Sequence, residues 1–262
     1  MAAMDTPRPP IPPATSAGRF PLLAMAGDFL LAAALMLLLM SLSMVGWGLL
    51  DSLQAGPGAA RPDPWQSPSE VFIAVSGGLS MLIAGLLLVR MRAFTRHPPV
   101  DEPAALRDPR TWRDAVLTGL ALVAASALLT ELLSLAGDVP DPGNMKLLEA
   151  LYAANPLWLI LVAVVLAPLA EELLFRRILF GRLLAAGRPW IGLVATSLLF
   201  GLLHEPPLGS DHPWLMHAGL LGFYALMGAA FAWLHRRTGT WWAAVAAHAV
   251  NNAVAALFLA PA

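Results

Sequence analysis

The sequence predicts an all-α fold, a polytopic transmembrane helical bundle of about seven spans with its N-terminus in the cytoplasm. Composition is the first observation behind this prediction, because 58% of the 262 residues are hydrophobic and only 13% are charged. Soluble domains carry roughly 25% charged residues, and the mean hydropathy of this chain is +0.68. The other two observations are the length of the apolar runs and the alternating placement of basic residues between them.

The apolar runs define the expected spans, since a helix needs about 20 mostly apolar residues to cross roughly 30 Å of hydrocarbon. The expected spans are residues 29–50, 71–89, 115–135, 156–170, 190–204, 214–234 and 240–259. We expect the fourth to continue as a helix to about Ala186. The fifth should end before Pro206 and Pro207, because proline cannot continue a helix. One additional short helix is expected around residues 146–153.

The basic residues give an independent prediction of orientation, because Lys and Arg concentrate in cytoplasmic loops. When the N-terminus is placed inside and the spans alternate in direction, nearly all of the 16 basic residues fall on the cytoplasmic side. Arg61 and Lys146 are the two that do not. A wrong span count would scramble this pattern, so the basic residues favour both the count and the orientation.

Three regions are expected along the chain. Residues 1–20 form a Pro-rich tail that we expect to be disordered, and residues 21–140 carry N-terminal transmembrane helices. Residues 141–262 form the transmembrane domain that holds the candidate site. The first apolar run is too long, and starts too late, for a usual cleavable signal, so we interpret it as an uncleaved anchor.

Charge and cysteine content exclude several classes of protein. A formal net charge of −1 argues against nucleic-acid binding, which needs a basic surface. The absence of cysteine excludes disulfides, thiolate catalysis and cysteine-ligated zinc or iron–sulfur sites. Membrane lipids are the expected surroundings. Abundant alanine, and arginine in place of lysine, are typical of a bacterial sequence of high GC content, so we expect the bacterial inner (cytoplasmic) membrane.

Polar side chains inside spans are the candidate functional residues, because such groups are costly to bury in a bilayer. Glu171 and Glu172 lie in the fourth span, His204 ends the fifth, and His248 and Asn252 lie within the seventh. If the fourth and fifth spans form a hairpin, Glu171 and His204 both lie about 25 Å from its tip. The seventh span brings His248 and Asn252 to a similar level, so we expect these side chains to converge.

Such a set of side chains is suited to peptide hydrolysis. A carboxylate in a partly desolvated site can act as a general base on a water molecule, and an imidazole can orient that water. A second imidazole and an amide can donate hydrogen bonds to the developing oxyanion. A carboxylate with two imidazoles is equally a ligand set for zinc, with water in the fourth position. The sequence leaves both versions open.

Three motifs, in order and each in an expected span, resemble those of the CPBP family, which comprises the CAAX prenyl endopeptidase type II and bacteriocin-processing (Abi) intramembrane proteases. They are Glu171-Glu172-x-x-x-Arg176, Phe200-x-x-x-His204 and His248-x-x-x-Asn252. The resemblance covers about residues 156–259, so the domain at 141–262 is expected to be a CPBP-like catalytic domain.

The resemblance implies a role for each matched residue. Glu171 would activate the water and His204 would help to position it. His248 and Asn252 would form the oxyanion site. Glu172 and Arg176 would shape or support the pocket, together with Phe200 of the second motif.

The resemblance also implies an intramembrane endopeptidase that hydrolyses peptide bonds of membrane-associated peptides or proteins. Members of the family are described both as metalloproteases and as metal-independent glutamate-type proteases. A zinc ion held by Glu171, His204 and His248 therefore stays open as an alternative. A prenylated protein substrate is not implied, because bacteria generally lack one.

The same residues also allow a non-catalytic interpretation. Glu171 and Glu172 beside Arg176 are compatible with a structural ion-pair network at the end of a helix. His248 and Asn252 are compatible with interhelical hydrogen bonding, a common role for these residues in membrane proteins. The alternative function is therefore a non-catalytic membrane protein: a peptide-binding immunity factor, a scaffold or a transporter.

Overall fold

The structure is a computed structural model that describes residues 20–54, 69–91, 102–137, 139, 145–207 and 213–258. Within these ranges every regular element is a helix, which confirms the predicted all-α class. Residues 1–19, which hold almost all of the expected disordered tail, lie outside the described residues. So do parts of the loops on which the predicted orientation depends, and the cytoplasmic placement of the N-terminus stays a prediction.

Five helices are long and apolar enough to cross a membrane. They are α1 (Pro21–Gln54), α2 (Glu70–Met91), α4 (Pro109–Ser134), the continuous helical stretch Pro156–Ala185 and α10 (Trp214–Thr238). Two shorter apolar helices, α9 (Pro189–His204) and α11 (Trp242–Leu257), complete the set. Each expected span therefore coincides with an apolar helix, whereas the number that cross a bilayer stays a prediction.

The structure differs from the expected elements at the start of the first helix and in one additional short helix. The first helix begins at Pro21 instead of at residue 29, because its first turns are apolar as well and proline is well placed at a helix start. The short helix expected near residue 146 is confirmed as α5 (Met145–Ala154). A further short helix, α3 (Glu102–Arg107), was not expected.

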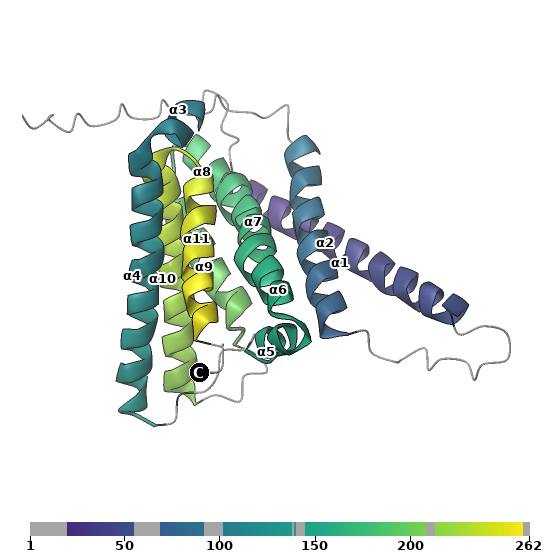
Figure 1. Cartoon of the computed structure of the whole chain (residues 1–262). Helices are drawn as coiled ribbons and strands as arrows, with labels where there is room; N and C mark the ends of the chain where they lie inside the picture. The colour runs from purple at the N-terminus through teal and green to yellow at the C-terminus, as the bar shows by residue number, and fades with distance from the viewer. Residues whose placement is uncertain are drawn as a thin grey trace, which may run out of the picture.

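Successive apolar helices run in alternating directions, and α4, α9, α10 and α11 stand close together, whereas α1 lies obliquely and leans away from them (Figure 1). Glycines let the helices of the group approach closely. A Cβ atom on Gly119 of α4 would lie 2.6 Å from the carbonyl oxygen of Ala247 in α11. A Cβ atom on Gly228 of α10 would lie 3.0 Å from Cα of Ser197 in α9. Such close backbone contacts are typical of membrane helix pairs.

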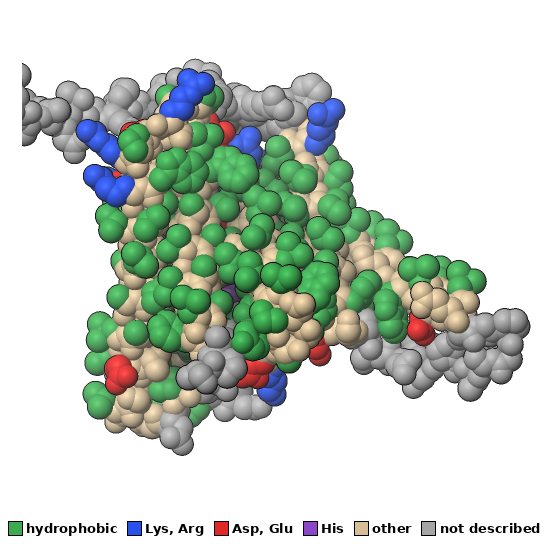
Figure 2. All heavy atoms as spheres, in the orientation of Figure 1, with side chains coloured by type: hydrophobic (Ala, Val, Ile, Leu, Met, Phe, Trp, Pro, Cys, Tyr) green, Lys and Arg blue, Asp and Glu red, His purple; other side chains and the backbone are tan. Residues whose placement is uncertain are grey.

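The surface of the molecule is apolar between two charged ends. Figure 2 shows hydrophobic side chains over the middle of the molecule, with Lys and Arg side chains mainly at the end that holds α3 and the start of α4. Large side chains such as Leu37, Leu38 and Leu42 of α1 are exposed. Exposed apolar surface of this extent is what a lipid-facing bundle requires.

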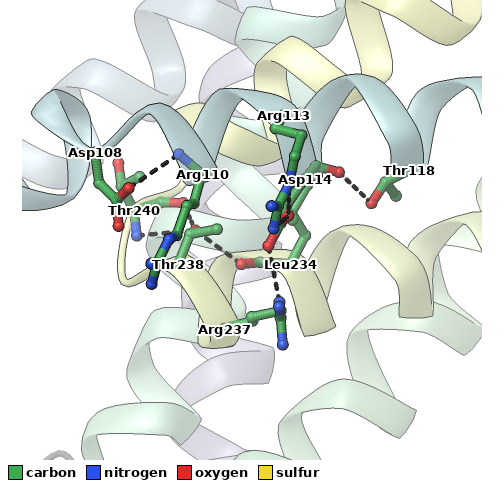
Figure 3. Close-up of polar contacts among 9 residues, drawn as sticks. All are labelled: Asp108, Arg110, Arg113, Asp114, Thr118, Leu234, Arg237, Thr238 and Thr240. Carbon is green, nitrogen blue, oxygen red and sulfur yellow. Dashed lines mark hydrogen bonds and ion pairs between the residues drawn. The ribbon is translucent and has the colours of Figure 1, made fainter. Parts of the chain in front are cut away.

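Polar contacts fasten the charged end of the bundle. Asp108 caps α4 by accepting from the backbone N–H of Arg110 (Figure 3). Asp114 lies between Arg113, at 2.7 Å, and Arg237 of α10, at 2.9 Å. The last turn of α10 is closed by Thr238, whose hydroxyl donates to the carbonyl of Leu234. These contacts tie α4 to the α10–α11 turn.

The helix that carries the glutamates contains two π-helical segments. It runs from α6 (Pro156–Leu159) through η2 (Ile160–Leu166), α7 (Ala167–Glu172) and η3 (Leu173–Phe180) to α8 (Gly181–Ala185). Pro168 lacks an N–H and would crowd the preceding turn of a regular helix. Just before it, the N–H of Ala167 bonds the carbonyl of Val162, five residues back, so the backbone widens there. Such π segments often occur at functional sites.

Candidate active site

Glu171 and His204 face each other from neighbouring helices. Glu171 is the next-to-last residue of α7 and His204 is the last of α9, and the turn between α8 and α9 joins the two as a hairpin. Oε2 of Glu171 lies 3.5 Å from Nε2 of His204, with side chains about one-fifth exposed. The two side chains meet, as expected from their equal distance to the hairpin tip.

Aromatic rings hold the imidazole of His204 on both sides. The Phe200 ring stacks on it with centroids 4.2 Å apart, and the Tyr224 ring of α10 stacks on it at 4.7 Å. Both interplanar angles are 27°. Nδ1 of His204 bonds the carbonyl of Phe200 at 2.9 Å. The ring therefore has little freedom to turn away from Glu171.

This arrangement assigns the hydrogen on the His204 ring. A carbonyl oxygen can only accept, so Nδ1 of His204 donates to Phe200 and Nε2 of the neutral ring is an acceptor. An ionised Glu171 also presents only acceptors. Oε2 of Glu171 is buried and has no hydrogen-bond partner among the described residues. Two acceptors that face each other are well suited to share the two hydrogens of one water molecule.

A second, fully buried group lies beside this pair. Oε2 of Glu172 is 3.0 Å from Nε of Arg176, one helical turn later, and Oε1 of Glu172 is 3.0 Å from Nδ1 of His248 on α11. Glu172 and Arg176 are 0% exposed and His248 is 3% exposed. Glu172 therefore fixes the tautomer of His248 by accepting from its Nδ1, and the bond joins α11 to the glutamate helix.

The guanidinium of Arg176 is enclosed by aromatic rings. It lies 4.8 Å from the ring centroid of Phe200, 5.2 Å from that of Phe231 and 5.5 Å from that of Phe175. Its Nη2 donates to the carbonyl of Gly228 at 3.0 Å. Cation–π contacts of this kind gain strength when desolvated. Arg176 thus joins the glutamate helix to α9 and α10.

Phe200 connects the two groups. Its ring contacts the His204 ring and also lies 6.2 Å from the His248 ring in an edge-to-face arrangement. The Phe231 ring stacks on the His248 ring with centroids 4.9 Å apart. Both imidazoles of the sequence motifs therefore converge on one aromatic cluster.

Asn252 lies one turn after His248 on α11. Its Nδ2 donates to the carbonyl of Ala163 in η2 at 2.8 Å, and its Oδ1 accepts from the amide of Asn251 at 3.0 Å. An amide nitrogen carries two hydrogens, so the Ala163 bond uses one and leaves the other. The structure thus brings Asn252 to the glutamate helix and fixes its amide orientation.

The described residues do not fit a three-ligand zinc site as they are arranged. Among them, no group of three His, Asp or Glu side chains could hold a metal ion. Glu171 and His204 face each other, but Nδ1 of His248 bonds Glu172 instead.

Two features of the site were not expected from the sequence. Tyr224 stacks on His204. In the sequence, one tyrosine in an apolar span cannot be told apart from a residue that only packs in the bundle. Glu205 is bonded to His217 of α10, with Oε1 3.0 Å from Nδ1. Adjacency to His204 was the available signal for Glu205. The pair holds the end of α9, and with it His204, against α10.

The site opens on a cavity of about 340 Å³. Glu171 and His204 are its ionisable lining residues, and its other walls are apolar. The cavity is bordered by α1 and α2 as well as by the hairpin. A carboxylate and an imidazole at the wall of an apolar cavity can act on a bound apolar substrate.

Comparisons with known proteins find similarity over the C-terminal part of the chain. Residues 153–254 match the family model described as "Type II CAAX prenyl endopeptidase Rce1-like". Over 109 residues the chain is 31% identical to "Putative membrane peptidase YdiL" of Bacillus subtilis (strain 168). That alignment covers 42% of this chain, which spans 40% of the length of the curated relative. No solved structure matches the chain.

Proposed function

We propose that the chain is a CPBP-type intramembrane endopeptidase that hydrolyses peptide bonds of membrane-associated peptides or proteins, a proposal supported by the match of residues 153–254 to a type II CAAX prenyl endopeptidase family model. The observation that carries the proposal is the pair formed by Glu171 and His204 at the wall of an apolar cavity. A water molecule shared by these two acceptors is the nucleophile. The bacterial cytoplasmic membrane is the proposed location.

The first step uses the shared water. Glu171 takes one proton from the water as its oxygen attacks the carbonyl carbon of the peptide bond, and Nε2 of His204 holds the other hydrogen. The Phe200 carbonyl keeps His204 in the required tautomer. General-base assistance of this kind contributes typically about 10²–10⁴-fold to the rate.

The negative charge that develops on the carbonyl oxygen needs donors. The first donor is Nδ2 of Asn252, because its bond to the Ala163 carbonyl uses only one of its two hydrogens. Nε2 of His248 is the second, and it donates in the doubly protonated ring, because Nδ1 already donates to Glu172. Loss of one such donor costs roughly 3–4 kcal/mol in known cases.

The tetrahedral intermediate collapses with transfer of the proton held by Glu171 to the leaving nitrogen. The C–N bond breaks and Glu171 returns to its ionised form. The products are a carboxylic acid and an amine, and transfer of the acid's proton to the amine gives a carboxylate and an ammonium. Glu172 and Arg176 take no part in proton transfer. They position His248 and Phe200 through the buried ion pair and the aromatic contacts.

A reconstituted cleavage assay tests the proposal. The purified full chain is placed in liposomes with quenched membrane-spanning peptides of varied sequence, and mass spectrometry identifies the products. Hydrolysis that yields two peptides with one water added supports the proposed function. If the peptides bind and no product forms under any condition that keeps the chain folded, the chain is a peptide-binding protein and the proposal is wrong.

A further inference from the structure

The wall of the active-site cavity opposite the hairpin is built by helices outside the region that matches the protease family. Four cavity-lining residues, Phe29, Ala32, Ala33 and Met36, come from α1, and two more, Met81 and Ala84, come from α2. The family match begins only at residue 153. This wall is therefore a feature of the chain's own N-terminal region.

The position of α1 against the hairpin is fixed by a buried charge and by helical periodicity. Asp28 is 1% exposed and is paired with Arg182 of α8. Met25, Asp28 and Ala32 are the buried residues of α1 and recur at the three- and four-residue spacing of one helix face. Phe29, Ala33 and Met36 border that face, which is turned toward Glu171 and His204.

The volume of the cavity limits what can enter. The cavity has a volume of about 340 Å³, which is space for a short stretch of a substrate chain. The small size follows from the residues at its wall, since Phe29, Met36 and Met81 fill space that the three alanines leave open.

The chemistry of the wall limits which side chains can enter. Glu171 and His204 are occupied by the reacting water and peptide bond, and every α1 and α2 residue at the wall is apolar. A charged or polar side chain in this space would lose its hydration without gaining a partner, which is costly. An apolar side chain gains by burial.

We propose that Ala33 and Met36 of α1, with Ala84 of α2, form a specificity subsite that receives one apolar side chain next to the cleaved bond of a membrane-embedded peptide. The subsite rests on the proposed function, because it takes Glu171 and His204 as the reacting pair. Ala33 sets its size, since this residue is half-buried and lines the cavity directly. Met36 closes it on the same helix face.

Filling and enlarging the subsite tests this proposal. Once mass spectrometry has located the cleaved bond, two peptides are compared that differ only in leucine or alanine beside it. Ala33→Phe should lower kcat/KM for the leucine peptide about 10-fold or more and leave the alanine peptide within about 3-fold, the range that hydrophobic pockets reach for small changes in size. Met36→Ala should shift the preference toward a larger side chain, such as phenylalanine.

The matched control is Ala34→Phe, because Ala34 is the neighbouring alanine of the same helix and is exposed. It should leave the kcat/KM ratio of the two peptides unchanged. The subsite is overturned if Ala33→Phe and Met36→Ala both leave that ratio at the wild-type value, or if Ala34→Phe shifts it equally. Glu171→Gln separates the two levels. If Glu171→Gln abolishes cleavage but Ala33→Phe and Met36→Ala leave the kcat/KM ratio of the two peptides unchanged, only the subsite is wrong. If Glu171→Gln cleaves as fast as the wild type, the proposed function and the subsite are both wrong.

Discussion

The N-terminal helix α1 and the glutamate helix are both long and apolar, yet they differ in how much of each is buried. In the most apolar window of α1 only 6% of the residues are buried, against 44% for Pro156–Ala185. The glutamate helix is enclosed by α2, α9 and α11 and carries the buried Glu172–Arg176 pair. The outer face of α1 is exposed, and only a narrow inner face contacts the rest of the chain.

This contrast indicates that the enclosed helices carry the reacting groups of the cavity and that α1 contacts the substrate. Groups that must hold a fixed geometry lie on the enclosed helices, where rings and ion pairs restrict every side chain. Most of the wall that meets the substrate lies on α1, whose most apolar window has the smallest buried share among the five long apolar helices. Variants of the enclosed region should therefore affect the rate or the stability, and variants of α1 should affect substrate binding.

Loss of the general base is expected to have the largest effect. Glu171→Gln keeps the size of the side chain and removes its ability to take a proton, so kcat should fall by about 10²–10⁴-fold with KM nearly unchanged. Glu131→Gln is the control, because Glu131 is an exposed carboxylate near the end of α4. Initial rates in liposomes measure both, and equal rates for the two variants would contradict the assignment.

Removal of the buried cation is expected to have the next largest effect. Arg176→Met leaves Glu172 buried without its ion pair, which should lower the free energy of unfolding by about 3–5 kcal/mol. Arg113→Gln removes an exposed partner of Asp114 and should cost only about 0–1 kcal/mol. Thermal unfolding in one detergent compares them. A similar loss in the two variants would mean that the enclosed region is not held by this network.

A smaller effect is expected where α1 joins the enclosed region. Asp28→Asn weakens the bond to Arg182, and a hydrogen bond between charged groups is worth about 1.5–3 kcal/mol. Because α1 forms the substrate wall and not the reacting pair, KM should rise several-fold while kcat stays within about 2-fold, since the groups that assist the reaction are unchanged. Steady-state kinetics measure the split, and a fall in kcat alone would contradict this division between α1 and the enclosed helices.

The smallest effect is expected from the ring that stacks on His204. Tyr224→Leu removes one side of the aromatic enclosure, whose stacking is worth about 0.5–1.5 kcal/mol, and should lower kcat by up to about 10-fold. Tyr224→Phe keeps the ring and should restore wild-type kcat. If phenylalanine fails to restore it, the hydroxyl and not the stacking is what the site uses.

The sequence predicted the parts of the site that depend on depth and missed those that depend on rotation about a helix axis. Glu171 and His204 lie at equal distances from one turn, so the constant rise per residue was enough to bring them together. Which glutamate faces His248 depends on the phase of the helix, and the π-helical segments on both sides of α7 change that phase. The bond between Glu172 and His248 therefore needed the structure.

The contribution of α1 to the cavity wall was missed for a different reason. The first span was expected to begin at residue 29, which left Asp28 outside it. Because α1 begins at Pro21, Asp28 lies within the helix and is buried against Arg182. Alanines and methionines facing a cavity carry no pattern that separates them from ordinary packing, so the substrate wall could not be predicted from the sequence.

A kinetic cycle through Glu171 and His204 tests most directly whether these two residues act on one water molecule. Rates of hydrolysis are measured for the wild type, Glu171→Gln, His204→Asn and the double variant. Groups that act as a unit give strongly non-additive losses. The double variant should therefore be no slower, within about 3-fold, than the slower single variant. Losses that multiply would show that Glu171 and His204 act independently and would contradict the shared water.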